Sequence, residues 1–208
     1  MIKKLLFCFF LMLTMTEWII AQENINWGIS AQYQYESPIG SLGSWFQPTP
    51  SSFSLSVEKF TSEGWFWKIK AEIIQFLHEN QDQLYYENLD LKLEIYGIAA
   101  QAKYFLLQNQ SKLQPYATGG AGIYRWFGRR GEYQLEDRLI PKRDQNDWSW
   151  GFNLGLGLDL FIYKNWAVTL SGSYQIIIGE LWPALALRLE NVSGFQCLTT
   201  AAGFSFYF

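Results

Sequence analysis

Hydrophobic and polar residues alternate one by one in eight separate segments of this chain. In the most regular segment, from Trp148 to Leu160, all even-numbered positions are Trp, Phe or Leu, and the intervening positions are Ser, Gly, Asn or Asp. Successive side chains of a β-strand point to opposite faces, so this pattern predicts strands with one apolar face, and a helix cannot produce it. The eight segments span residues 27–35, 53–58, 65–73, 89–104, 115–124, 148–160, 166–170 and 197–208.

The fourth segment changes phase along its length. Its apolar residues are odd-numbered up to Ile95 and even-numbered from Ile98 to Tyr104. One extra residue inserted into a strand has this effect, so we expect a β-bulge at Gly97.

The connections between the segments alternate in length. Three are short, over residues 61–64, 106–112 and 163–165, and four are long, over residues 36–51, 78–88, 126–147 and 179–194. Alternating short turns and long loops are typical of transmembrane β-barrels, and bacterial single-chain barrels have an even number of strands. The sequence therefore predicts an all-β fold, an eight-stranded antiparallel up-and-down transmembrane β-barrel, with no linker or second domain.

Composition favours a membrane barrel over a soluble β-protein. Aromatic residues make up 18% of the chain, with ten Trp, and charged residues only 17%, which is low for a soluble domain. After residue 22 no apolar run is long enough for a membrane-spanning helix. A barrel whose outer face meets lipid and whose rims carry Trp and Tyr requires this composition. The net charge of −3, without a basic patch, argues against nucleic acid as a partner.

The N-terminal segment reads as a signal for export. Lys3 and Lys4 precede an apolar stretch from Leu5 to Leu13, and Ala21 offers a cleavage site. A membrane anchor is the alternative, but the apolar stretch is too short for one. We therefore expect a signal peptide over residues 1–22 and a barrel domain over residues 23–208.

The chain ends in an alternating aromatic strand. Phe204, Phe206 and Phe208 share one face, and Gly203, Ser205 and Tyr207 the other. This ending resembles the closing strand of bacterial outer-membrane barrels. The resemblance implies that the three Phe residues form the signal that the barrel-assembly machinery reads.

Other stretches extend the resemblance over the whole mature chain. They are Pro115-Tyr116 followed by Gly120 and Gly122, and the run Gly151–Asp159. With them the chain resembles small outer-membrane β-barrels of the OmpA-transmembrane and OmpX type, and among these the PorT-like proteins of Gram-negative bacteria. The resemblance implies a location in the bacterial outer membrane, in contact with lipid and lipopolysaccharide. Barrels of this kind include structural proteins, adhesins, lipid-modifying enzymes and secretion components, so the fold does not settle function.

Alternation also places charged side chains inside the barrel. We expect an ionic cluster in the lumen formed by Glu58, Lys68, Lys70, Glu72, Asp90, Lys92, Glu94 and Asp159. If the third and fourth strands pair so that Lys70 faces Glu94, Glu72 faces Lys92, and the charges compensate each other. The cluster is then either a packed plug that closes the lumen or the lining of a narrow conduit.

The third long connection has the most distinctive composition of the predicted surface loops. It combines cations with aromatic and aliphatic residues, namely Arg129, Arg130, Tyr133, Arg138, Leu139, Ile140, Lys142 and Arg143. Cations at an outer rim contact lipopolysaccharide phosphates, whereas the apolar Leu139-Ile140-Pro141 favours a protein partner. The apolar stretch 181–187 of the fourth loop has the same unusual composition, and it either docks a partner, caps the barrel or extends a strand.

Catalysis has few candidate residues. His78 is the single histidine, and it lacks the His-x-Ser pattern that the resemblance implies for lipid-modifying barrels. Cys197 falls on the inward face of the last strand, where we expect a small buried filler. We therefore expect no enzymatic activity, no cofactor and no metal, and a structural or interaction role, for example in an envelope or secretion complex. A lipid-modifying enzyme and a narrow channel are the alternatives.

Overall fold

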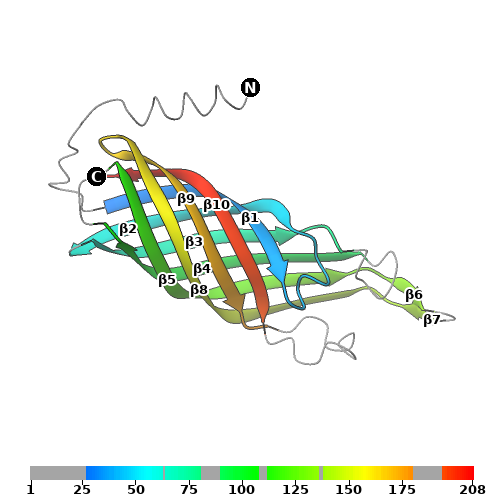
Figure 1. The fold of residues 1–208 in the computed structure, drawn as a ribbon. Coiled ribbons are helices and arrows are strands. Elements are labelled where there is room, and N and C mark those ends of the chain that lie inside the picture. Colours follow the sequence, from blue (N-terminus) through cyan, green and yellow to red (C-terminus); the bar gives the residue numbers. More distant parts are fainter. Residues whose placement is uncertain (1–26, 63, 81–89, 108–111, 136–137, 180–193) are drawn as a thin grey trace, which may run out of the picture.

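The chain forms a closed antiparallel β-barrel of eight strands, which confirms the predicted fold class (Figure 1). The computed structural model describes residues 27–62, 64–80, 90–107, 112–135, 138–179 and 194–208, so the predicted signal peptide lies outside the described residues. Around the barrel the order is β1-β10-β9-β8-β5-β4-β3-β2, so the first and last strands close it. These strands are β1 (Trp27–Ile39), β2 (Thr49–Ser62), β3 (Trp65–Phe76), β4 (Leu91–Phe105), β5 (Leu113–Arg130), β8 (Arg143–Tyr163), β9 (Trp166–Ile177) and β10 (Phe195–Tyr207). No helix in the described part of the chain is long and apolar enough to cross a membrane.

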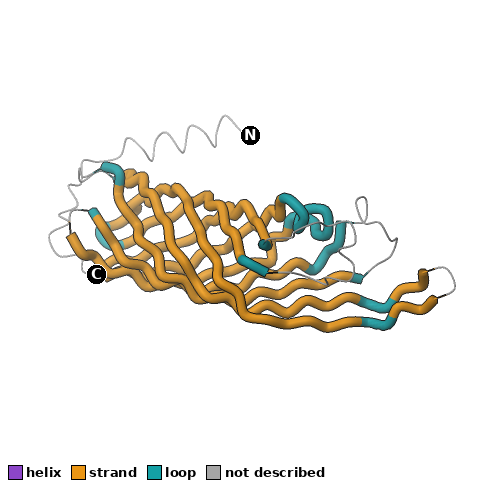
Figure 2. Tube along the Cα trace, turned by 90° about the horizontal axis from the view of Figure 1, so that it is seen from below, coloured by secondary structure: helices purple, strands orange, loops and turns teal. Residues whose placement is uncertain are grey.

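Strands β4, β5 and β8 extend furthest at the loop end, where β5 pairs with β4 as far as Leu91 and Arg130. The pairing of β5 with β8 runs without interruption to Arg130 and Arg143, whereas β8 pairs with β9 only from Gly151 onward. Two short strands, β6 (Tyr133–Leu135) and β7 (Arg138–Ile140), follow at the tip (Figures 1 and 2). The prediction of a loop over residues 126–147 is thus wrong for most of its length. The alternation fails in β8 there because residues 143–147 are polar at every position and none of them is buried. We call residues 126–135 and 138–147 the ribbon.

The outer surface carries an apolar belt between two aromatic rims. We call the end of the barrel where β1 begins and β10 ends the terminal end, and the opposite end, where β1 ends and β2 begins, the loop end. Exposed aromatic residues at the terminal end are Trp27, Trp65, Trp67, Trp166 and Phe208, and those at the loop end are Tyr35, Tyr96, Phe127, Trp148 and Trp150. Rings also pack across strands, with centroids 4.7 Å apart for Trp65 and Tyr104. Such aromatic girdles mark the two lipid–water interfaces of a transmembrane barrel.

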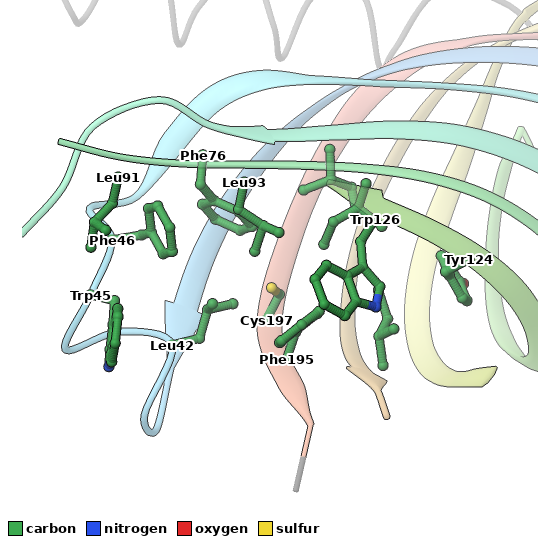
Figure 3. Packing of buried hydrophobic residues seen from close by; sticks show 13 residues of the cluster. Leu42, Trp45, Phe46, Phe76, Leu91, Leu93, Tyr124, Trp126, Phe195 and Cys197 are labelled. Carbon is green, nitrogen blue, oxygen red and sulfur yellow. The ribbon is translucent and has the colours of Figure 1, made fainter. Parts of the chain in front are cut away.

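The interior is filled in three layers. At the terminal end an aromatic floor is formed by Phe66, Phe105, Tyr116, Phe161, Ala167 and Tyr207. Buried polar and charged side chains occupy the middle. At the loop end an apolar roof is formed by Leu42, Trp45, Phe46, Ile74, Phe76, Leu91, Leu93, Ile95, Tyr124, Trp126, Ile177, Phe195 and Cys197 (Figure 3). An eight-stranded barrel is just wide enough for its own side chains, and here they fill both ends.

Strand β4 is regular, and the predicted bulge at Gly97 is absent. Its pairing with β3 and with β5 proceeds residue by residue through Gly97, and odd-numbered side chains point inward throughout. The apolar residues change face because the surroundings change. In the lipid-facing half they lie outside, whereas Leu93 and Ile95 near the loop end belong to the roof.

Gly97 has a steric reason for its place. The ring of Tyr124 crosses the interior between Gly97 and Gly151. A Cβ at Gly97 would come within 2.3 Å of the Tyr124 ring, and one at Gly151 within 2.5 Å. Both positions therefore need glycine for this ring to fit.

Candidate functional site

The buried charged side chains in the middle of the barrel form two groups, a lower and an upper one. The lower group lies next to the aromatic floor and is centred on Lys103. The Lys103 Nζ lies 2.8 Å from Asp159 Oδ2 and 3.1 Å from Glu58 Oε2, and it also donates to the Tyr207 hydroxyl at 2.8 Å. The Tyr207 hydroxyl in turn donates to Asp159, and Lys68 Nζ lies 3.5 Å from Glu58 Oε1. All these side chains are buried. Two lysines thus balance two carboxylates, which is the arrangement that makes buried charges tolerable.

Aromatic rings surround Lys103 on the floor side. Its Nζ lies 4.3 Å from the ring centroid of Tyr116, 4.9 Å from that of Phe105 and 5.4 Å from that of Tyr207. Cation–π attraction adds to the ion pairs in such a desolvated site. Lys103 was not among the residues that we predicted in the lumen. The alternation indicated this position, because Ala102 and Tyr104 on either side of it were predicted on the outer face.

The upper charged group lies between the lower group and the roof. Lys70 Nζ is 2.7 Å from Glu72 Oε2 on the same strand. The other oxygen of Glu72 accepts hydrogen bonds from the Tyr124 hydroxyl and from Gln175 Nε2, both at 3.1 Å. Glu36, fully buried on β1, accepts a hydrogen bond from Thr199 Oγ1 at 2.7 Å through its Oε2.

The structure brings together five of the eight charged residues that the sequence placed in the lumen. Glu58, Lys68, Lys70, Glu72 and Asp159 are buried in the two groups. The other three, Asp90, Lys92 and Glu94, are on the outside near the loop end, and their inward placement was wrong. The even-numbered residues of β4 face outward, and beyond the lipid belt the outside of the barrel meets water.

The predicted pairing of β3 with β4 was also wrong. Lys70 faces Ala99 and Glu72 faces Gly97, so neither meets Glu94 or Lys92. That register assumed charged residues at both positions on the inner face of β4. The inner face of this part of β4 is instead made of small and apolar residues.

The connection between β1 and β2 folds into the barrel mouth as a lid, which we define as residues 40–48. Leu42, Trp45 and Phe46 of the lid are buried in the roof, and the rings of Phe46 and Phe76 lie 5.6 Å apart (Figure 3). Backbone hydrogen bonds hold the lid to the next loop, from Gln47 N to His78 O and from Asn80 N to Trp45 O, both at 2.9 Å. Sequence reasoning missed the lid, because its apolar residues follow no strand or helix period.

The ribbon presents charged and aromatic residues on its outer face. Arg129 Nε lies 3.3 Å from Asp144 Oδ1. At the base of the ribbon, the Arg125 guanidinium carbon lies 5.3 Å from the ring centroids of both Phe127 and Trp148. Cations and acids therefore both occur on this surface, and no single sign dominates.

The residues predicted for the third loop fall into three environments. Arg129, Leu139, Lys142 and Arg143 are exposed, Ile140 is half-buried, and Arg130 is buried, with Nη2 donating to Pro141 O at 2.8 Å. Tyr133 and Arg138 pair through their backbones with Ile140 and Leu135 in the β6–β7 hairpin. The stretch 181–187 of the fourth loop lies outside the described residues.

The structure also shows where the histidine, the cysteine and the C-terminal aromatic residues lie. His78 is exposed, and Cys197 is a buried free thiol of the roof, as expected. In β10, Phe204 and Phe208 are exposed on the lipid-facing side and Tyr207 is buried. The described ranges hold no group of three or more His, Cys, Asp or Glu placed to bind a metal ion.

Comparison with known sequences identifies the family. A profile described as "Outer membrane protein beta-barrel domain" matches residues 5–193. The chain belongs to this family and is a protein of the bacterial outer membrane. In such barrels the short turns are periplasmic and the longer loops extracellular, so the lid and the ribbon are at the outer surface. No curated protein matches the sequence.

Solved structures with the same fold include other small outer-membrane barrels. The chain is similar to Neisserial surface protein A, with 17% identity, a TM-score of 0.56, and coverage of 88% of this chain and 97% of that one. It is also similar to a major outer membrane protein of Thermus thermophilus, with 10% identity, a TM-score of 0.55, and coverage of 89% and 100%. At these identities the likeness shows the fold alone.

Proposed function

We propose that this protein is a closed structural barrel that holds an interaction element, the ribbon, above the outer membrane. The observation that carries the proposal is the continuous pairing of β5 with β8 out to Arg130 and Arg143. A loop that only joins two strands needs no such extension, since two-residue turns suffice. A paired ribbon presents side chains at a fixed distance from the membrane with less loss of conformational entropy on binding than a flexible loop.

The chemistry of the ribbon favours a protein partner over a purely lipid one. Its outer face carries both acids and bases, as in the pair Arg129 and Asp144, and Leu139 near its tip is 62% exposed. A lipopolysaccharide surface is rich in phosphate and would favour a basic face. We therefore infer a partner protein of the cell envelope, in an accessory role, with lipopolysaccharide contacts limited to the cations at the loop-end rim. The proposed role involves no catalysis and no cofactor.

The test removes the tip and keeps the barrel. Residues 131–142 are replaced by a two-residue Asn-Gly turn, which joins Arg130 and Arg143 at the end of their paired strands. We expect the variant to reach the membrane and to show the same heat-dependent gel mobility as the wild type. A partner that purifies with the wild-type protein in mild detergent is expected to be lost.

Photo-crosslinking locates the contact. A crosslinking amino acid at Leu139 should capture the partner, whereas one at Leu156, 64% exposed on the lipid-facing wall, should not. Equal capture from both positions, or a partner retained after the deletion, would contradict the role of the ribbon. Altered lipid A mass that depends on His78 would instead support the lipid-modifying alternative.

A further inference from the structure

The two charged groups inside the barrel differ in their net charge. In the lower group Lys68 and Lys103 compensate Glu58 and Asp159. In the upper group Lys70 is the single buried cation among the described residues, and it faces two buried carboxylates, Glu72 and Glu36. Lys70 is engaged with Glu72 at 2.7 Å. The upper group is thus one positive charge short of neutrality.

An unbalanced charge is unfavourable in this position. Glu36 is fully buried, and the apolar roof separates the upper group from water at the loop end. The aromatic floor separates the interior from the periplasmic side. Moving an uncompensated carboxylate into such a site costs several kcal/mol, on the order of the penalty for a buried ion without a partner. The folded state is therefore more stable when a positive charge is bound next to the Glu36 carboxylate.

Three buried oxygen atoms without a partner come from neighbouring positions of β1 and β2. Glu36 Oε1, Gln34 Oε1 and Ser52 Oγ have no hydrogen-bond partner among the described residues. Gln34 and Glu36 are consecutive inward residues of β1, and Ser52 faces Gln34 across the β1–β2 ladder. The register of this ladder shifts between Gln34 and Glu36, which places an irregularity of the backbone at the same point.

We propose that Glu36, Gln34 and Ser52 form an internal site for one small monovalent cation of the size of Na⁺. Carboxylate, amide and hydroxyl oxygens are the ligands that hard cations prefer. One positive charge neutralises the upper group, whereas a divalent ion overcompensates it. A water molecule leaves the negative charge of Glu36. A proton on Glu36 removes that charge but leaves one of the three oxygens without a partner. One small cation neutralises the charge and offers a ligand position to all three oxygens.

The test compares a small cation with a bulky one. The purified full-length mature protein is refolded from urea into detergent in sodium chloride or in tetramethylammonium chloride at equal concentration, so that the ion is present when the barrel closes. We expect the melting temperature to be higher in sodium by at least about 3 °C, since a ligand that binds only the folded state raises stability. Glu36→Gln should abolish the difference and Ser52→Ala should reduce it.

Glu94→Gln is the matched control, because it removes a carboxylate from the outer face of β4, and it should keep the sodium effect. Crystals grown in sodium chloride should show a density peak for a bound ion beside Glu36 that crystals grown in tetramethylammonium chloride lack. Equal melting temperatures in the two salts, or a sodium effect that survives in Glu36→Gln, would overturn the site. So would a carboxylic acid band in the infrared spectrum that Glu36→Gln removes, since it would identify a proton there. If Glu36→Gln does not fold, Ser52→Ala and the comparison of the two crystals still decide.

Discussion

At the scale of single residues, the interior depends most on Lys103. Its ammonium group touches carboxylates from β2 and β8 and a hydroxyl from β10, so one side chain of β4 connects four of the eight strands. Tyr207, the last residue of β10, is one of these partners. The strand whose lipid-facing side carries Phe204, Phe206 and Phe208 is therefore fixed from inside through this lysine.

We expect Lys103→Met to destabilise the barrel strongly. The substitution keeps most of the side-chain volume but leaves Glu58 and Asp159 short of a cation, and breaking a buried ion pair costs about 3–5 kcal/mol. Equilibrium unfolding in urea, measured in lipid vesicles, gives the change in the free energy of unfolding.

Lys59→Met is the control for this substitution. Lys59 is exposed at the terminal end, with Nζ 5.2 Å from the ring centroid of Trp27. An exposed cation–π contact contributes about 0.5–1 kcal/mol, so the loss should be small. A similar loss for both variants would mean that Lys103 contributes no more than a surface charge.

At the scale of elements, the lid and strand β4 show where sequence patterns predict structure and where they fail. Alternation of apolar residues identified all eight barrel strands, because lipid on one side and a narrow lumen on the other impose a two-residue period. The same two-residue period led to the wrong face for Lys92 and Glu94. Beyond the lipid belt the outer face of the barrel meets water, and the inner face belongs to the apolar roof, so the polar residues lie outside. The lid was missed because Leu42, Trp45 and Phe46 obtain their burial from distant strands, which no local pattern records.

We expect Phe46→Ala to loosen the roof. Phe46 is 1% exposed and packs against Phe76, and removing a buried phenyl ring costs about 3–5 kcal/mol. The β-barrel holds together through its ladders, so the effect should concentrate in the lid. Hydrogen exchange should show faster exchange of the amides of Gln47 and Asn80, which bond between the lid and the next loop.

Leu139→Ala is the control, because Leu139 is an exposed apolar residue of the ribbon. We expect its free energy of unfolding to change by no more than about 0.5 kcal/mol. If exchange at Gln47 and Asn80 were unchanged in Phe46→Ala, the lid would be held by its backbone hydrogen bonds rather than by its aromatic anchors.

At the scale of the whole molecule, the layers of the interior bear on whether the barrel conducts. A pore needs a continuous hydrated path, but the aromatic floor and the apolar roof close the lumen at both ends of the charged middle. The charged groups between them are paired, apart from the one charge in the upper group that we assign to a bound cation. Such an interior suits a rigid support for the ribbon better than a passage for solutes.

We therefore expect the purified protein to pass no steady current in planar lipid bilayers. Apolar and aromatic side chains form most of the floor and the roof, and dehydrating an ion in an apolar constriction is costly. Removing the lid, by replacing residues 41–46 with a Gly-Ser linker, opens the roof but leaves the floor, so it should also produce no current. A steady current through the wild-type protein whose ion selectivity changes in Lys70→Glu would contradict the closed interior. The upper charged group would then line a conduit, and the narrow-channel alternative would replace the structural role.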